Sequence, residues 1–341
     1  MAIVGGFDVH RAQITFDRVD TETGEVRTGQ IRPATRDNLR RWLEPLAGRG
    51  EVAFALEGCT GWRFVAEELT RAGVEVHVAE PADTAMLRGR KRRAKTDRGD
   101  ARHLRELLVA GRVPESWLAP EHVLEVRAIG RLYVGLMDQR RGWQQRIHAQ
   151  LFHQGAPPIK HLLTGAGREQ LAAAPLSPAG RRVVEVALSV IDHLTGQIVP
   201  LRAELAGVAR RQAGCRALMS HYGIGPLTSP IIWAEMGDCR RFSSSDQAVR
   251  HTGLDVTVYS SDNKRAGSGH LARQGPPVLR WALVEAAQCA ARPTSPDHAY
   301  YLDVKARAGG NRAALSVARK LARRAHHTLR ALGDAALAPA G

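Results

Sequence analysis

The spacing of apolar residues in the first 110 positions predicts a five-stranded sheet interleaved with helices. Residues 3–9 form a nearly continuous apolar run, and the segments 13–19 and 25–31 follow it closely. Short connections of this kind favour an antiparallel meander. Farther along, helical and strand periods alternate. They predict helices at 35–46, 62–72 and 97–110 and two more strands at 51–57 and 74–79.

The pattern changes between residues 120 and 213, where strand signals disappear and apolar residues recur at helical spacing. Glycine and proline at 155–158, and prolines at 175–178, break this region into at least two helical pieces. We predict a long helical hairpin or linker that could also dimerise. The chain ends in a basic helix at 312–332, whose cations suit a solvated face and a nucleic-acid surface equally.

The charge of the chain indicates a nucleic-acid partner. The 341 residues are 44% hydrophobic and 24% charged, with a formal net charge of +15 and a pI of about 10.6. Such an excess favours a polyanion, nucleic acid in preference to a membrane surface. No apolar run approaches the ~20 residues of a membrane span, and the N-terminus is unlike a signal peptide. The four cysteines form no CxxC pair, so we expect neither zinc nor disulfides, and a reducing cytoplasm.

Residues 88–103 combine a run of cations with two carboxylates. Asp97 and Asp100 are three apart, so a helix that begins near Thr96 would place them on one face. Cations that attract phosphates, next to carboxylates that could hold Mg²⁺, suit an enzyme that cuts nucleic acid. A solvated charge run, capped by aspartates at a helix N-terminus, accounts for the same residues. The cations that we expect to contact nucleic acid are Arg90, Lys91, Arg92, Arg93 and Lys95.

Two further carboxylates lie near the ends of predicted strands. Asp8 is near the end of the first strand, and Glu57 ends the fourth. A meander followed by alternating helices and strands is the order of the ribonuclease-H-like fold, although other α/β domains of this length are equally permitted. In that fold the first and fourth strands are neighbours, so Asp8 and Glu57 would lie side by side, with Asp97 and Asp100 above them. We predict that the four carboxylates bind one or two Mg²⁺ ions.

A glycine turn at 221–230 is a second candidate contact with DNA. Gly223 and Gly225 stand between apolar helical segments, as in a helix-hairpin-helix turn whose backbone N–H groups approach a phosphate. An ordinary helical turn has the same pattern. The polar loop at 252–269 and the helix after it supply three more candidate phosphate contacts, namely Lys264, Arg265 and Arg280.

An ordered set of motifs resembles one bacterial and archaeal insertion-sequence family, known as IS one-ten, to which the Piv DNA invertase is kin. Residues 8–10 (DVH), 56–61 (LEGCTG) and 95–101 (KTDRGDA) resemble the family's DEDD catalytic motifs. The runs that resemble its second conserved domain are 223–227 (GIGPL), 235–238 (EMGD), 241–244 (RFSS), 252–255 (TGLD) and 275–283. Each motif is short, but the ordered set spans nearly the whole chain.

The resemblance implies an α/β domain followed by all-α parts. These are a RuvC-like DEDD domain at 1–115, a helical coiled-coil linker at 116–213, and a mainly helical transposase domain at 214–335. It also implies a serine that attacks a DNA phosphodiester to form a phosphoserine intermediate, with the DEDD carboxylates and Mg²⁺ completing the site. The family places this serine in a Ser-Gly-x-Lys-like context. Ser261 is the best match, with Asp262 in place of glycine, and Ser260 is the second choice.

The resemblance further implies the partners. They are the DNA of the element's ends and target, a structured guide (bridge) RNA, and other copies of the chain in a homodimer or tetramer. Guidance by RNA would explain why so basic a protein carries little obvious base-reading machinery. Two other functions stay open. One is a metal-dependent nuclease of the Holliday-junction-resolvase type that uses the four carboxylates alone, and the other is a non-catalytic nucleic-acid-binding remnant.

Overall fold

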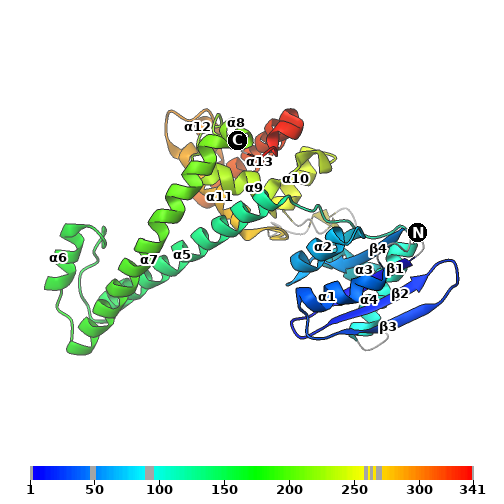
Figure 1. Ribbon diagram of the computed structural model, residues 1–341. Helices are drawn as coiled ribbons and strands as arrows, with labels where there is room; N and C mark the ends of the chain where they lie inside the picture. Colours follow the sequence, from blue (N-terminus) through cyan, green and yellow to red (C-terminus); the bar gives the residue numbers. More distant parts are fainter. Residues whose placement is uncertain are drawn as a thin grey trace. The chain divides into compact units, whose positions relative to one another are not determined.

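The computed structural model describes residues 3–46, 51–88, 96–256, 260–261, 264–265 and 271–339. The chain divides into two compact units, Met1–Leu118 and Ala119–Gly341. The first is a mixed α/β unit, and the described part of the second is mainly helical (Figure 1). Strands thus give way to helices, as the change of pattern from about residue 120 predicts.

The first unit is built on a five-stranded mixed sheet with the strand order β3–β2–β1–β4–β5. The first three strands form an antiparallel meander, whereas β4 pairs in parallel with both β1 and β5. The predicted meander and the predicted pairing of the first and fourth strands are therefore confirmed. The strands are β1 (Ile3–Val9), β2 (Ile14–Asp20), β3 (Val26–Ile31), β4 (Val52–Glu57) and β5 (Glu75–Ala79).

Helices cover both faces of this sheet. On one face a core that contains Phe7 and Phe54 also includes buried leucines of α1 and α2. On the other face Val4, Ala53 and Ala55 pack with Leu104 and Leu108 of α4. The helices of the unit are α1 (Arg36–Leu43), continued by a 3₁₀ turn η1 (Glu44–Leu46), α2 (Trp62–Arg71), α3 (Pro81–Leu87) and α4 (Asp97–Val109). The short helix α3 was not predicted.

Two consecutive glycines in β1 leave room for close neighbours on both faces of the sheet. A Cβ atom on Gly6 would lie 2.1 Å from the carbonyl oxygen of Ala101 in α4. A Cβ atom on Gly5 would lie 2.1 Å from the ring of Phe54. Because the neighbour of Gly6 is backbone, no side-chain movement could make room for a larger residue there. The glycine therefore sets the distance between α4 and the sheet.

A buried ion pair also attaches α4 to the sheet. Arg105 of α4 and Asp17 of β2 are both buried, and Arg105 Nε lies 2.6 Å from Asp17 Oδ1. Burial raises the pKa of Asp17 even though Arg105 acts in the opposite direction. Removal of either partner would leave a buried charge without compensation.

The second unit begins with a long helical hairpin, as the sequence predicts. Helices α5 (Glu121–His153) and α7 (Pro178–Arg211) pack side by side, with α6 (Gly165–Ala173) near the bend (Figure 1). An apolar cluster of all three helices includes Ile147, Leu171 and Ile191. Among the described helices, α7 alone is long and apolar enough to cross a membrane by length and composition, and 28% of its apolar window is buried. The buried part of α7 packs against α5 and α6.

The remaining helices of the second unit gather around α13. Buried alanines, valine and leucines along α13 face the surrounding helices, and α8–α12 all have residues next to it or to its neighbours. The helices are α8 (Ala213–Leu218), α9 (Thr228–Met236), α10 (Ser245–Thr252), α11 (Pro277–Gln288), α12 (His298–Ala308) and α13 (Gly310–Leu332). Short 3₁₀ turns, η2 (Cys239–Arg241), η3 (Cys289–Ala291) and η4 (Gly333–Ala336), complete the unit.

The basic side chains of α13 are largely tied to other parts of the second unit. Arg324 and Lys320 both pair with the buried Asp297, at 2.5 and 2.7 Å, and Arg323 pairs with Asp246 at 2.9 Å. Two more of its arginines donate to main-chain oxygens, Arg319 to Leu254 and Arg330 to Phe242. Most of these charges thus also hold the unit together, while the solvated face and the nucleic-acid surface considered from the sequence both stay predictions.

Candidate active site

Asp8 and Glu57 are neighbours at the carboxyl-terminal ends of the paired strands β1 and β4. The parallel register pairs Phe7 with Leu56, so the residues that follow on both strands are neighbours. Successive side chains of a strand point to opposite faces. Asp8 therefore points to the same face as Val4, and Glu57 points to the same face as Ala55. This is the face that α4 covers.

The other two carboxylates come from the first turn of α4. The side chain of Thr96 caps this helix by accepting a hydrogen bond from the Gly99 N–H at 3.1 Å. The cap starts the helix where the sequence predicts it and puts Asp97 and Asp100 in its first turn. Asp100 is buried, whereas the Asp97 side chain is 45% exposed. The name acidic edge is used below for Asp8, Glu57, Asp97 and Asp100.

One half of the acidic edge contains a histidine. The Nε2 atom of His10 lies 3.0 Å from Asp8 Oδ2 and 3.6 Å from Asp97 Oδ1. The ligand atoms of these three residues all lie within 4.8 Å of one another. The amide of Gln13 donates to the other oxygen of Asp97, Oδ2, at 3.0 Å. Asp97 is thus oriented by a side chain from the start of the second strand.

The other half of the acidic edge contains an arginine. Arg88 forms an ion pair with Asp100, and its Nη2 lies 3.9 Å from Glu57 Oε1. The guanidinium of Arg88 therefore lies between two carboxylates that come from β4 and α4. Its positive charge offsets part of the repulsion between them.

The charges at this edge favour a bound cation. Burial is the main cause of the raised pKa of Asp8, and the nearby Asp100 and Asp97 raise it further, while His10 lowers it. Ionised Asp8 is thus disfavoured by its surroundings, and a divalent cation would relieve that cost. The donor set of carboxylate oxygens and one imidazole also suits such an ion. The acidic edge therefore fits a metal.

The sequence did not identify three of the side chains at this edge, His10, Gln13 and Arg88, as site residues. His10 stands two residues after Asp8, in a motif that the sequence singled out, but nothing marked its imidazole. Gln13 reaches Asp97 across 84 positions, which no local pattern reveals. The predicted contacts Arg90, Lys91, Arg92, Arg93 and Lys95 lie outside the described residues.

In the second unit, the candidate serines lie on a short strand pair. β6 (Ser260–Ser261) pairs antiparallel with β7 (Lys264–Arg265), with Ser261 opposite Lys264 and Ser260 opposite Arg265. For these four residues the structure describes the backbone alone, and Asp262 lies outside the described residues. The register thus brings the two predicted cations to the backbone positions opposite the two candidate serines. The segment 253–276, which carries this pair, is called the serine loop.

The base of the serine loop is held by main-chain hydrogen bonds. The Arg273 N–H donates to Gly253 O at 3.2 Å, and the Ala272 N–H donates to Asp255 O at 3.0 Å. An antiparallel bridge between Val256 and Leu271 extends the pairing by one step. The two ends of the loop are therefore brought together before the chain reaches the serines.

Two arginines reinforce this base. Arg280 Nη1 donates to Thr252 O at 3.2 Å and to Gly275 O at 3.4 Å. Arg319 Nε donates to Leu254 O at 2.6 Å. Burial, with Arg273 nearby, lowers the pKa of Arg280. The structure thus gives Arg280 a role inside the loop, while its predicted contact with phosphate stays a prediction.

The glycine turn between α8 and α9 is also bound within the second unit. Gly223 has a φ of +91°, and a Cβ atom there would lie 2.3 Å from the Ala286 carbonyl oxygen of α11. The Gly225 N–H donates to Thr228 Oγ1 at 3.0 Å. Close packing against α11 is a sufficient reason for the first glycine. The predicted contact of this turn with a DNA phosphate stays a prediction.

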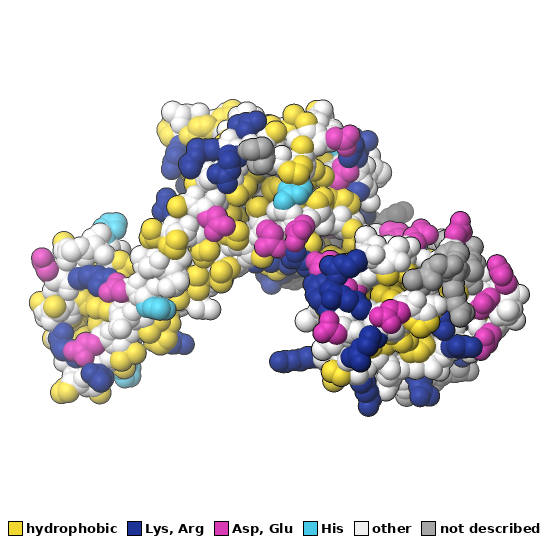
Figure 2. Space-filling model, in the orientation of Figure 1, with side chains coloured by type: hydrophobic (Ala, Val, Ile, Leu, Met, Phe, Trp, Pro, Cys, Tyr) yellow, Lys and Arg dark blue, Asp and Glu magenta, His cyan; other side chains and the backbone are white. Residues whose placement is uncertain are grey.

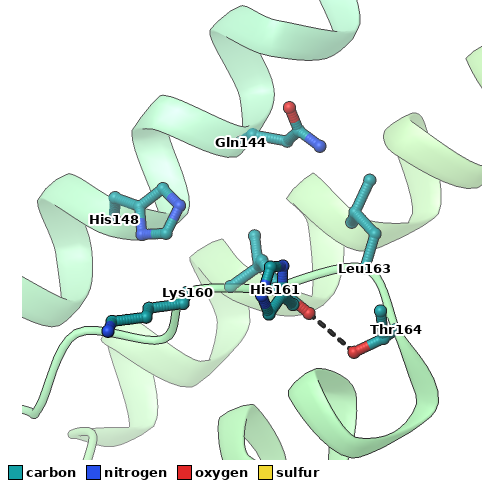
Figure 3. Close-up of a pocket in the computed structure, with 7 residues that line it drawn as sticks. Gln144, His148, Lys160, His161, Leu163 and Thr164 are labelled. Carbon is teal, nitrogen blue, oxygen red and sulfur yellow. Dashed lines mark hydrogen bonds between the residues drawn. The ribbon is translucent and has the colours of Figure 1, made fainter. Parts of the chain in front are cut away.

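A pocket of about 390 Å³ lies near the bend of the helical hairpin and is lined by basic and polar side chains and two leucines. Figure 3 shows Gln144 and His148 on one helix opposite Lys160 and His161, with Thr164 donating to the His161 carbonyl oxygen at 2.8 Å. None of the predicted site residues lines it. Apolar side chains are also exposed along this hairpin (Figure 2), with Phe152 exposed to 87%.

Two family models match the chain. A transposase model of the DEDD type from the IS110 family matches residues 5–153, which includes the whole acidic edge. A model described as Transposase IS116/IS110/IS902 family matches residues 215–302, which includes the serine loop. The two matches follow each other in the order that the sequence motifs predict.

Three curated relatives are transposases. A probable family 20 transposase of Pseudomonas aeruginosa is 23% identical over 332 residues, which are 93% of this chain and 94% of the relative. The transposase for insertion sequence element IS1111A of Coxiella burnetii is 25% identical over 306 residues, 86% and 81% of the two chains. The transposase for insertion sequence element IS1328 of Yersinia enterocolitica is 25% identical over 242 residues, 69% of each chain.

A DEDD-type unit followed by a second transposase region defines an enzyme that cuts and rejoins DNA. The chain belongs to the IS110/IS116/IS902 family of insertion-sequence transposases. The family resemblance predicted from the sequence motifs is thereby confirmed.

Proposed function

We propose that this transposase cuts and rejoins DNA through a covalent serine–phosphate link, with a divalent metal held at the acidic edge. The placement of Asp8, Glu57, Asp97 and Asp100 at one end of one sheet, on the face that α4 covers, is the observation that carries the proposal. Isolated carboxylates at strand ends are common, but here four from three separate segments lie at the same end of the sheet. A solvated charge run would not require such convergence.

The topology of the first unit supports a RuvC-like, ribonuclease-H-like domain. Its sheet order, with a meander followed by two parallel strands, is the order on which the prediction rested. We propose functional parts at 1–115, 116–213 and 214–335, with the helical hairpin as a coiled-coil linker between the acidic edge and the serine loop. The packing of α5 along α7 supports the linker.

The four carboxylates would hold the metal, proposed to be Mg²⁺. When bound, a divalent ion supplies a Lewis acid that stabilises negative charge on a phosphate. The protein's own contribution is to bring the carboxylates together through Gly6 and the Thr96 cap. Gln13 orients Asp97, and the guanidinium of Arg88 lies between Glu57 and Asp100.

The serine loop would supply the nucleophile, Ser261 in the first place and Ser260 in the second. The hydroxyl oxygen forms a bond to phosphorus and loses its proton, while the bond from phosphorus to one sugar oxygen breaks. That sugar oxygen leaves as a hydroxyl once it has gained a proton. One ester is exchanged for another, so the reverse step can rejoin DNA without a further energy source.

The partners would be the DNA of the element's ends and target, a structured guide RNA, and other copies of the chain in a dimer or tetramer. The net charge of +15 supports binding to polyanions. We propose that the basic run that includes Arg90 and Lys95 contacts nucleic acid, and that Lys264 and Arg265 contact phosphates near the serine. The DNA substrate and the four cysteines, which are all free thiols, support a cytoplasmic location.

Trapping of a covalent adduct tests the serine. The full-length protein is incubated with radiolabelled element-end DNA, its purified RNA and Mg²⁺, then denatured, and the adduct is mapped by mass spectrometry. We expect an adduct at Ser261 that Ser261→Ala abolishes and that Asp8→Ala also abolishes. Ser220→Ala, at an exposed serine that bonds Ala217 O, is the matched control.

The rival function gives a different result. A nuclease of the Holliday-junction-resolvase type would cleave branched DNA by hydrolysis, form no adduct, and keep its activity in Ser261→Ala. An adduct that moves to Ser260, or that only Ser260→Ala abolishes, would assign the second choice. Cleavage that survives both serine substitutions would overturn the covalent mechanism.

A further inference from the structure

The two halves of the acidic edge differ in the basic side chain that lies between their carboxylates. Arg88 lies between Glu57 and Asp100, so a positive charge is already present in that half. In the other half the imidazole of His10 lies between Asp8 and Asp97. The His10 side chain is 53% exposed, so its ring can turn without disturbing a packed core.

We propose that His10 is a metal ligand, which binds a divalent ion through Nε2 together with Asp8 Oδ2 and Asp97 Oδ1. The inference rests on the proposed metal site and assigns to it a residue outside the four carboxylates. Two atoms that are each about 2.1 Å from one ion at a right angle are about 3 Å apart. The Nε2 distances of 3.0 and 3.6 Å to the two oxygens are close to that spacing.

The hydrogen bond from Gln13 supports the same assignment. Gln13 Nε2 donates to Oδ2 of Asp97, and His10 lies closer to the other oxygen, Oδ1. One oxygen of Asp97 is therefore held by the protein, while the second is directed to the same space as Nε2 of His10. An outer side chain that orients a ligating carboxylate in this way is a usual feature of metal sites.

A nitrogen ligand changes which ion the site prefers. Mg²⁺ strongly prefers oxygen ligands, whereas imidazole suits transition metals and Mn²⁺ accepts mixed oxygen and nitrogen donors. The half of the acidic edge with His10 should therefore bind Mn²⁺ more tightly than Mg²⁺. The half with Arg88 has no such preference, because its protein donors are carboxylate oxygens.

Direct measurement of Mn²⁺ on the full-length protein tests this ligand without relying on activity. The Kd for Mn²⁺ is measured by the loss of the free-ion electron paramagnetic resonance signal, and competition gives the Kd for Mg²⁺. Electron spin-echo modulation then detects a directly bound imidazole nitrogen. The variants are His10→Gln, which offers an oxygen in place of the nitrogen, and Asp8→Asn. His153→Gln, at an exposed histidine of α5, is the matched control.

We expect the wild type and His153→Gln to show nitrogen modulation, and His10→Gln to lose it. The preference for Mn²⁺ over Mg²⁺ should fall by about tenfold in His10→Gln. If His10→Gln keeps the nitrogen modulation and the preference for Mn²⁺ over Mg²⁺, while Asp8→Asn loses Mn²⁺ binding, His10 is not a ligand. The metal site itself would stand. Mn²⁺ binding that is unaffected in Asp8→Asn would instead overturn the metal site of the proposed function. Thermal unfolding of each variant confirms that it is folded.

Discussion

The acidic edge and the serine loop are both proposed to act on DNA, and the chain builds them in different ways. At the acidic edge the carboxylates stand on two paired strands and a capped helix, and the contact between Gly6 and Ala101 sets their spacing. The serines stand on a strand of two residues, whose loop is held at its base by main-chain bonds and two arginines.

The difference follows from what each part must do. Four carboxylates that repel one another have to be held at the same end of the sheet, which requires regular elements packed at backbone distance. A single nucleophilic serine needs only a loop whose ends are fixed, because the bound DNA can orient the serine hydroxyl. We therefore expect damage to the packing that supports the acidic edge to affect the whole first unit, and damage at the base of the serine loop to affect the reaction more than the fold.

The largest effect should come from removal of one charge at the acidic edge. Asp8→Asn should lower the rate of strand exchange by at least ~10³-fold. The same change should raise the free energy of unfolding by about 1 kcal/mol, because ionised Asp8 is disfavoured by burial and by two neighbouring aspartates. Rates of DNA strand exchange and denaturant unfolding curves measure the two effects. Asp37→Asn, at an exposed aspartate of α1, should change neither, and a loss of stability in Asp8→Asn would contradict this account.

Gly6→Ala should break the acidic edge as a structure. The new Cβ atom would lie 2.1 Å from the Ala101 carbonyl oxygen, so α4 has to move away from β1. We expect a loss of about 3 kcal/mol in the free energy of unfolding, measured by chemical denaturation. Gly135→Ala in α5, where a Cβ atom would meet nothing within 4 Å, should instead stabilise the protein slightly. Equal stability of the two variants would show that α4 is not held at backbone distance.

Arg280→Ala tests the serine loop. Loss of its two hydrogen bonds to loop carbonyls should lower the rate of strand exchange about tenfold, with little change in DNA affinity. Single-turnover rates and DNA binding at several salt concentrations separate the two. Arg307→Ala, at an exposed ion pair with Asp303, is the control. If affinity and its salt dependence fall while the rate stays unchanged, Arg280 contacts phosphate, as the sequence predicted, and does not support the loop.

The smallest effect on strand exchange should come from a carboxylate of the first unit outside the acidic edge. Glu68 of α2 bonds Arg36, Arg40 and Arg71, and these bonds, chiefly that from Arg40, lower its pKa to about 2. Its contribution to stability is therefore complete above its ordinary pKa of 4.5 and is lost as the pH falls from there through about 2.

Glu68→Gln should cost about 2 kcal/mol at pH 7 and much less at pH 2. Its neighbour Glu67 is about one-third exposed and pairs with Arg36 and Arg63, so Glu67→Gln should cost only about 0.5 kcal/mol. Thermal unfolding between pH 7 and pH 2 measures both. If Glu68→Gln lowers the free energy of unfolding as much at pH 2 as at pH 7, the proposed charge interactions are wrong. Asp8 and Glu68 thus contrast a carboxylate that we propose for function with one that stabilises the fold.

The sequence predicted the elements of the acidic edge well, because each is a local pattern. Alternation marked the strands that end near Asp8 and at Glu57, and Thr96 followed by Asp97 is a local helix-start signal. The short helices α3, α6 and α12 were not predicted, because a helical period is hard to recognise in so few residues. The adjacency of Asp8 and Glu57 was inferred from the order of the elements, and the parallel pairing of β1 with β4 confirms it.

Other features could not be predicted, because the partners are distant in the chain. Arg88 reaches Asp100 and Glu57 only after α3 turns the chain back toward the sheet, and Gln13 meets Asp97 across the sheet edge. Arg280 was predicted from its charge to bind phosphate, but its bonds to Thr252 and Gly275 depend on how the loop closes. Charge and periodicity indicate which residues are available, while tertiary contacts decide how they are used.

The internal pairing of α13 has a consequence for how this protein should respond to salt. DNA binding weakens with salt because each phosphate contact releases condensed counterions. The three cations Lys320, Arg323 and Arg324 share two carboxylates, those of Asp246 and Asp297, so most of their charge is already balanced and would release few ions unless those pairs broke. The net charge of +15 already subtracts these carboxylates, whereas the 49 lysines and arginines overstate the number of cations that can displace ions. The slope of log Kd against log salt should reflect the cations outside α13, and the acidic partners of this helix limit how strongly the chain adheres to DNA of arbitrary sequence.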